Sequence, residues 1–191
     1  TVPAAERTIL FIGTSLTAGL GVEPDQAWPA LIQRKIDSAG LDYRVVNAGV
    51  SGETSAGALR RLDWLMRSPA AVVVIETGAN DGLRGQDPDS IKANIQQIVD
   101  GIKQRQPQAK ILLVGMNTMR NLGRDYVSRF EAIYPELART NNVPLVPSLL
   151  AGVGGIDSLN QPDGIHPTPA GHAIMAATVW RTLQPLLVPA S

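Results

Sequence analysis

Residues 8–15 read TILFIGTS, a short apolar run followed at once by Gly-Thr-Ser. The run at 8–12 is rich in β-branched and aromatic side chains, which is typical of a strand buried on both faces of a parallel sheet. Pro144 lies in a similar run and suits an edge strand or the start of a strand. We expect strands at 8–12, 43–46, 71–76, 110–114 and 143–146.

Segments with apolar residues at helical spacing separate these runs. The expected helices carry their apolar faces on Trp28, Leu31, Ile32 and Ile36, on Leu59, Leu62, Leu65 and Met66, on Ile91, Ile95, Ile98, Val99 and Ile102, on Phe130, Ile133 and Leu137, and on Ile174, Met175 and Val179. The last helix is expected to begin at Thr168-Pro169, an N-cap followed by proline. This alternation predicts an α/β fold of three αβα layers, with a doubly wound, flavodoxin-like sheet of five parallel strands.

Composition limits the classes of protein to which the chain can belong. Its 191 residues hold 17 basic and 17 acidic side chains, so the formal net charge is zero, and they include no cysteine. We expect a single domain over residues 1–191, because a chain of this length can build one core. Zero net charge argues against nucleic acid as a partner, and no apolar run is long enough to cross a bilayer. The lack of cysteine excludes disulfides, thiolate metal sites and a cysteine nucleophile.

The expected architecture also indicates where a site would lie. In open α/β sheets the ligand crevice lies beyond the carboxyl ends of the strands. The segments to search for chemistry are therefore those that follow the expected strands, namely 13–21, 47–53, 77–85, 115–123 and 148–166.

Histidine narrows the choice of a catalytic base, because the chain has only two. His166 follows Asp163 by three residues across Gly164, so the carboxylate can bind one ring nitrogen and leave the other free to take a proton. Taken alone, this pattern is more often a turn beside a surface histidine. His172 has no such carboxylate before it, and we interpret it as an ordinary residue of the last helix.

A base of this kind needs a hydroxyl group to activate. Ser15 is the leading candidate because it lies two residues beyond the first expected strand, and Ser51, which follows the second, is its rival. Each could equally be a serine in a glycine-rich turn. Neither fits the Gly-x-Ser-x-Gly elbow of α/β-hydrolases, because Thr17 and Glu53 occupy the fifth positions.

Two further groups could stabilise a developing oxyanion. Asn80 offers an amide donor after the third expected strand, and Gly49 offers a backbone N–H after the second. Each has an ordinary interpretation as a turn residue. Four post-strand segments that supply a nucleophile, donors and a base at one sheet edge favour a catalytic interpretation.

These four blocks resemble the SGNH hydrolases, also called GDSL-type esterases and lipases. The blocks read Gly-Thr-Ser-Leu at 13–16, Asn-Ala-Gly-Val-Ser-Gly-Glu-Thr at 47–54, Gly-Ala-Asn-Asp at 78–81 and Asp-Gly-Ile-His-Pro at 163–167. The chain is most similar to the bacterial multifunctional esterase/thioesterase/lysophospholipase and arylesterase subgroup. The resemblance implies the SGNH fold, with Ser15 as nucleophile, His166 as base oriented by Asp163, and an oxyanion hole formed by the N–H groups of Ser15 and Gly49 and the Asn80 side chain.

One position departs from the family pattern. The first block usually has aspartate where this chain has Thr14. Threonine cannot carry the same charge-assisted hydrogen bonds, which leaves open how the nucleophile loop is braced.

The reaction that the resemblance implies is acyl transfer to water, without a metal or an organic cofactor. We expect short- to medium-chain acyl esters as substrates, including aryl esters, with thioesters and lysophospholipids as further candidates. The stretches 116–119 and 149–156 could line an acyl pocket or could equally pack in the core.

Two other functions stay open at this point. A carbohydrate acetylesterase of the same superfamily would use the same triad, although the loops are apolar and hold few aromatic residues for stacking on sugars. A nucleotide- or phosphate-binding flavodoxin-like module would explain the glycines of 13–21, but this segment lacks the P-loop lysine.

We expect a monomer that acts on a small-molecule acyl ester, without nucleic acid and without stable membrane insertion. We also expect a periplasmic or secreted location, because relatives of the family are commonly exported and the Thr1 start fits a trimmed chain.

Overall fold

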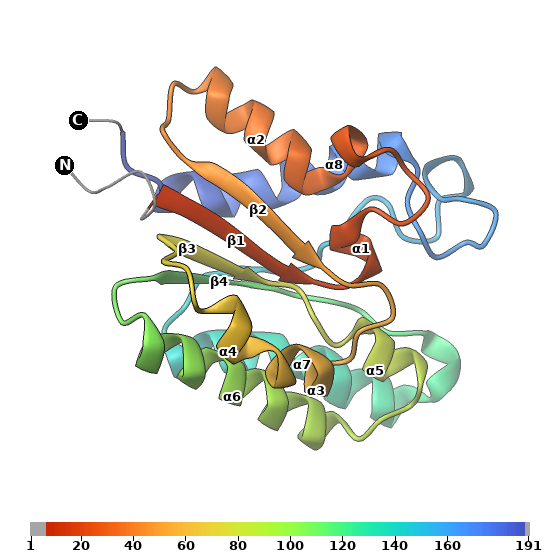
Figure 1. Cartoon of the computed structure of the whole chain (residues 1–191). Helices are drawn as coiled ribbons and strands as arrows, with labels where there is room; N and C mark the ends of the chain where they lie inside the picture. The colour runs from red at the N-terminus through yellow and green to blue at the C-terminus, as the bar shows by residue number, and fades with distance from the viewer. Residues whose placement is uncertain (1–6, 190–191) are drawn as a thin grey trace.

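The computed structural model describes residues 7–189, and it contains one parallel sheet with the order β2-β1-β3-β4-β5 (Figure 1). The strands are β1 (Thr8–Gly13), β2 (Arg44–Gly49), β3 (Val72–Ile75), β4 (Lys110–Val114) and β5 (Leu145–Val146). All four neighbouring pairs are parallel. The predicted α/β fold with a five-stranded, flavodoxin-like sheet is confirmed.

Helices cover both faces of this sheet, as Figure 1 shows. One face carries α2 (Trp28–Ser38) and α8 (Pro169–Leu183), which pack on each other, and the other carries α3 (Ser55–Arg60), α4 (Leu62–Leu65), α6 (Pro88–Arg105) and α7 (Arg124–Asn141). Two short helices, α1 (Ser15–Ala18) and α5 (Ala79–Leu83), lie at the carboxyl edge of the sheet, and 3-10 turns occur at Pro24–Gln26, Arg120–Leu122, Asp157–Leu159 and Gln184–Leu186.

The apolar periodicity of the sequence matches the core. The side chains of β3 are fully or almost fully buried, because β3 lies in the middle of the sheet between β1 and β4. All five isoleucine and valine residues of the predicted stripe on α6 have no exposed surface. Their burial contributes roughly 1.5–3 kcal/mol for each such side chain.

Two details of the predicted elements are wrong. The second strand is not buried on both faces, since Arg44, Val46 and Asn47 are exposed, and the reason is that β2 forms an edge of the sheet. The stripe at 59–66 belongs to two short helices rather than one, with a break at Arg61. The edge position expected for the strand with Pro144 is confirmed in β5.

His172 joins the two helices on one face of the sheet. It lies on α8, which begins after its predicted N-cap Thr168, and its Nδ1 accepts a hydrogen bond of 3.0 Å from the N–H of Trp28 at the start of α2. The N-cap of α2 is Ala27, which has no side-chain acceptor, so the imidazole takes over this capping function. Burial lowers the pKa of His172 to about 4, helped by the charge of His166. The second histidine is therefore neutral at pH 7 and structural.

The parallel arrangement brings the carboxyl ends of all five strands to one edge. The segments singled out in the sequence follow these ends, as α1 and α5 show at the right of Figure 1. Within residues 7–189, no helix is both long and apolar enough to span a lipid bilayer.

Candidate active site

Ser15 is the first residue of α1 and directly follows the end of β1. Its Oγ lies 3.0 Å from Nε2 of His166, although 151 residues separate the two in sequence. The turn between strand and helix is tight, because a Cβ at Gly13 would lie 2.2 Å from Oγ1 of Thr17. Only glycine fits there, and Ser15 keeps 8% of its surface exposed.

Asp163 holds His166 by its side chain and by its backbone. Oδ2 of Asp163 lies 2.5 Å from Nδ1 of His166, and Oδ1 accepts the N–H groups of Ile165 and His166 at 2.9 and 3.0 Å. Gly164 has a φ of +71°, which lets the chain turn between them. The hydrogen bond from His166, followed by these backbone N–H groups, lowers the pKa of Asp163 to about 2. The carboxylate therefore stays ionised throughout the neutral range.

The segment that carries His166 is tied to the segment that carries Ser15. The Gln161 N–H donates to the His166 carbonyl at 2.8 Å, and Nε2 of Gln161 donates to the carbonyls of Leu20 and Pro167 at 2.8 and 2.9 Å. Leu20 lies just beyond α1, so one glutamine links both parts of the site. The surrounding backbone thereby holds the side chains of Ser15, Asp163 and His166 in place.

A buried carboxyl group that sequence reasoning missed holds the turn that carries Ser15. Glu76 has no exposed surface, and its Oε1 accepts the Thr14 N–H at 3.0 Å and the hydroxyls of Thr14 and Thr17 at 2.9 and 2.8 Å. Thr14 therefore does make hydrogen bonds to a carboxyl group, as the donor. Burial raises the pKa of Glu76 to about 7, against the lowering effect of these hydrogen bonds. The available signal was an acidic residue at the end of the apolar run 71–76.

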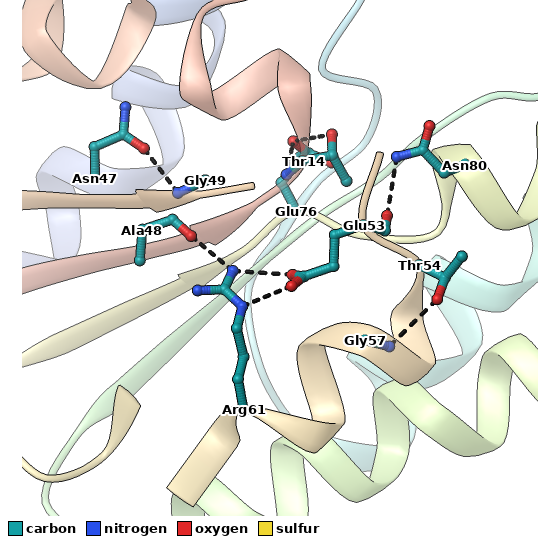
Figure 2. Close-up of polar contacts among 10 residues, drawn as sticks. All are labelled: Thr14, Asn47, Ala48, Gly49, Glu53, Thr54, Gly57, Arg61, Glu76 and Asn80. Atoms are coloured by element: carbon teal, nitrogen blue, oxygen red, sulfur yellow. Dashed lines mark hydrogen bonds and ion pairs between the residues drawn. The ribbon is translucent and has the colours of Figure 1, made fainter. Parts of the chain in front are cut away.

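Two of the three expected oxyanion donors are free to act. The Ser15 N–H has no acceptor within the described part of the chain. Asn80 lies in the first turn of α5, and its Nδ2 donates one hydrogen to the Glu53 carbonyl at 2.9 Å (Figure 2), which leaves its second hydrogen available.

The third expected donor, Gly49, is not free. Its N–H donates to Oδ1 of Asn47 at 2.9 Å, as Figure 2 shows. Glycine is needed here for another reason, since a Cβ would lie 2.4 Å from the backbone nitrogen of Ala18. Gly49 therefore lets β2 approach α1, and its N–H is already hydrogen-bonded to the Asn47 side chain.

Gly52 offers an N–H in the same loop. It lies in a turn closed by the Glu53 N–H and the Val50 carbonyl at 3.3 Å, and it has a φ of +79°. Arg84 donates to its carbonyl at 3.1 Å, whereas its N–H has no acceptor among residues 7–189. The carbonyl of the next residue, Glu53, accepts the hydrogen bond from the Asn80 side chain. The free N–H of Gly52 therefore lies near the amide group of Asn80.

An ion pair between Arg61 and Glu53 holds the turn at 50–53 in place. Nε and Nη2 of Arg61 donate to the two carboxylate oxygens of Glu53 at 2.7 and 2.9 Å, and Nη2 also donates to the Ala48 carbonyl at 2.6 Å (Figure 2). Both side chains are largely buried, with 20% and 8% of their surfaces exposed. A two-point contact of this kind is far more rigid than a single surface ion pair.

The remaining sequence candidates lie elsewhere. Ser51, the rival nucleophile, is exposed in the turn at 50–53, and His166 contacts Ser15 instead. Met116 is buried, so it packs in the core, whereas Met119 is 48% exposed. No group of three or more histidine or acidic side chains within the described residues could hold a metal ion.

Comparisons with known proteins point to one family. The GDSL-like Lipase/Acylhydrolase family matches residues 11–174. Esterase TesA of Pseudomonas aeruginosa is 44% identical over 188 residues, which is 98% of this chain and 92% of that protein. Thioesterase 1/protease 1/lysophospholipase L1 of Escherichia coli is 38% identical and covers 96% and 86% of the two chains. The crystal structure of TesA superimposes with a TM-score of 0.89 at 43% identity, covering 94% of this chain and 99% of that one.

The buried Glu76 carboxyl predicts a specific dependence of stability on pH. Its pKa is 4.5 in an unfolded chain and about 7 in the folded protein. Between these values the folded state keeps a proton that the unfolded state has lost, so stability from this group is complete below pH 4.5 and is lost as the pH rises through 7. The loss corresponds to roughly 3 kcal/mol.

A Glu76→Gln variant stays neutral and should lack this loss. Urea unfolding of both proteins at pH 5 and pH 8 measures it, and titration of other groups cancels in the comparison. We expect the wild-type free energy of unfolding to fall more steeply than that of the variant. Equal changes in the two proteins would show that Glu76 does not titrate in this range.

Proposed function

Because the chain belongs to the GDSL-like lipase/acylhydrolase family and is a serine ester hydrolase, we propose that Ser15, His166 and Asp163 are its catalytic triad. The observation that supports this best is the continuous contact from Ser15 Oγ to His166 Nε2 at 3.0 Å and from His166 Nδ1 to Asp163 Oδ2 at 2.5 Å. A hydroxyl, an imidazole and a carboxylate in this order are the parts that acyl transfer needs.

The reaction proceeds in two halves. As Ser15 Oγ attacks the ester carbonyl carbon, Nε2 of His166 takes the hydroxyl proton and then gives it to the leaving alcohol. Water attacks the resulting acyl-enzyme, gives its proton to His166, and releases the acid while Ser15 recovers its hydroxyl. Asp163 stays ionised because of its low pKa, so it keeps the proton on Nδ1 of His166 and stabilises the imidazolium.

The oxyanion of the tetrahedral intermediate needs preorganised donors. We assign this function to the N–H of Ser15, the second amide hydrogen of Asn80, and the N–H of Gly52 in place of Gly49. The support is that these donors are free, whereas the Gly49 N–H is bound to Asn47. Removing one such donor costs roughly 3–4 kcal/mol of transition-state stabilisation in serine hydrolases.

A Ser15→Ala variant removes the attacking oxygen without changing the fold. We expect kcat for p-nitrophenyl butyrate to fall by at least about 1,000-fold, because only the donors and substrate binding remain. Unchanged circular dichroism would confirm that the variant is folded. Wild-type turnover in this variant would exclude Ser15 as the nucleophile.

The two histidines provide an internal control for that experiment. His166→Ala should lose activity to a similar extent, because the base and the nucleophile act as a unit. His172→Ala should keep kcat within about threefold while it lowers the free energy of unfolding, since the Trp28 N–H loses its acceptor. The opposite pattern would mean that the base is His172.

The substrates are small molecules, and we propose short- to medium-chain acyl esters, including aryl esters, with thioesters and lysophospholipids within range. Several apolar side chains at the carboxyl edge are more than 40% exposed, which suits an acyl chain at the surface: Leu20, Leu83, Met119, Ile156 and Ile165. Among relatives, one of Vibrio mimicus is an arylesterase, 33% identical over 94% of this chain and 89% of that protein.

A series of p-nitrophenyl esters from acetyl to palmitoyl tests this substrate range. We expect kcat/KM to peak at short or medium chains, because the exposed apolar side chains provide a limited contact area. Acetate release from acetylated xylan, measured beside it, should be much slower. A peak only at the longest chains, or faster deacetylation of xylan, would contradict the proposal.

We further propose that the enzyme acts as a monomer, without nucleic acid, in the periplasm or after secretion. Its zero net charge supports the absence of a polyanionic partner. The proposed location rests on the membership of the chain in this family.

A further inference from the structure

Glu76 is a buried acidic side chain that the triad does not use. It directly follows β3, and its backbone N–H donates to the Ile12 carbonyl at 2.9 Å, which extends the pairing of β1 with β3 by one residue. Its side chain has no exposed surface. Burying a carboxyl group costs free energy unless hydrogen bonds compensate for the lost water.

Within residues 7–189, every hydrogen bond of the Glu76 side chain goes to the turn that carries Ser15. Figure 2 shows Glu76 beside Thr14: Oε1 accepts the N–H and the hydroxyl of Thr14, and Oε2 lies 3.0 Å from the same hydroxyl. Oε1 also accepts the Thr17 hydroxyl. Thr14 and Thr17 are 1% and 0% exposed. The carboxyl group therefore contacts the residue before Ser15 and the residue two positions after it.

These contacts control both reactive groups of Ser15. Thr14 is the N-cap of α1, and its hydroxyl oxygen also accepts the Leu16 N–H at 3.4 Å. A shift of Thr14 would move the adjacent Ser15 N–H and would change the 3.0 Å contact between Oγ and His166. Misplacements well below the size of an atom cost rate in a preorganised site.

The charge of Glu76 is stabilised by these donors alone. No lysine or arginine of residues 7–189 forms an ion pair with it. Tyr134 of α7 faces Glu76, and its hydroxyl donates to the Thr77 carbonyl at 2.7 Å, while Asp81 of α5 lies close to Tyr134. Both are neutral or acidic, so neither favours the carboxylate. Burial consequently raises the pKa of Glu76 to about 7.

We propose that Glu76 is a positioning residue for ester hydrolysis, whose ionised carboxylate holds Ser15 in place through Thr14 and Thr17. This inference rests on the proposed function of Ser15. Hydrogen bonds to a carboxylate are roughly twice as strong as those between neutral groups. When the carboxyl group takes up a proton, one oxygen becomes a donor, the hydroxyls must rearrange, and the turn loosens.

The proposal predicts two ionisations on the acidic side of the pH profile. Activity requires Glu76 as a carboxylate in addition to the unprotonated catalytic base. On the acidic side of the profile, log kcat/KM should therefore fall with a slope that approaches two. A protein without an ionisable group at position 76 should fall with a slope of one.

Glu76→Gln tests this, because glutamine keeps the shape and an acceptor oxygen but cannot ionise. We expect the slope to change from two to one, kcat at pH 8 to fall roughly 100-fold because the neutral amide does not hold the turn, and KM for p-nitrophenyl butyrate to stay within about twofold. A Glu76→Gln enzyme that keeps a slope of two would overturn the proposal.

Asp81→Asn is the matched control. Asp81 is equally buried and accepts one N–H and one hydroxyl, both from Ser55, at 2.9 and 2.6 Å. It contacts the start of α3 rather than the nucleophile turn. We expect this variant to keep the slope of two, and a slope of one here would assign the second ionisation to Asp81 and refute the inference.

Thr17→Val provides a test that leaves the carboxyl group in place. It removes one donor to Glu76 at nearly constant volume, so the carboxylate is less stabilised and the acidic limb should move to higher pH. If kcat/KM falls over the same acidic pH range as in the wild-type enzyme, the inference is contradicted. Ser15→Ala separates the two claims, because an inactive Ser15→Ala beside a normal Glu76→Gln would leave the triad intact and remove only the function given to Glu76.

Discussion

β1 pairs with β2 on one side and with β3 on the other, and this register determines which residues meet in the site. Gly13 lies opposite Gly49, and Ile12 lies opposite Ile75. The residues that follow these three strand ends therefore leave the sheet side by side. One brings Ser15, another brings the turn at 50–53, and the third brings Glu76 with Asn80 four residues later. The meeting of these groups therefore depends on how β1 pairs with its two neighbours.

The two carboxyl groups that flank Ser15 lie in different surroundings. Asp163 is exposed at the surface, and its hydrogen bonds to His166 favour the ionised form. Glu76 is buried without a cation, and its ionised form costs the protein stability in the neutral range. The two carboxyl groups thus have opposite shifts in pKa, and both are connected to Ser15, one through His166 and the other through Thr14 and Thr17.

Much of the fold and part of the site could be predicted from the sequence, because they depend on local patterns. β-branched runs marked the strands, Thr168-Pro169 marked the start of α8, and the spacing of Asp163 and His166 marked their contact. The exposure of β2 depends on strand order, which no local pattern encodes. The Gly49 N–H is bound to the Asn47 side chain, whose rotamer no local pattern predicts. The Glu76 carboxyl group contacts Thr17 and Thr14, which lie 59 and 62 positions earlier in the chain, so this contact also required three-dimensional information.

The central claim is that the acyl group is carried on Oγ of Ser15. Treatment of the protein with a fluorophosphonate, followed by peptide mapping with mass spectrometry, tests it without any assumption about the natural substrate. The reagent needs a serine activated by a base, so we expect one adduct per chain on Ser15, with loss of esterase activity at the same rate. An adduct on Ser51, or full inactivation without modification of Ser15, would contradict the account.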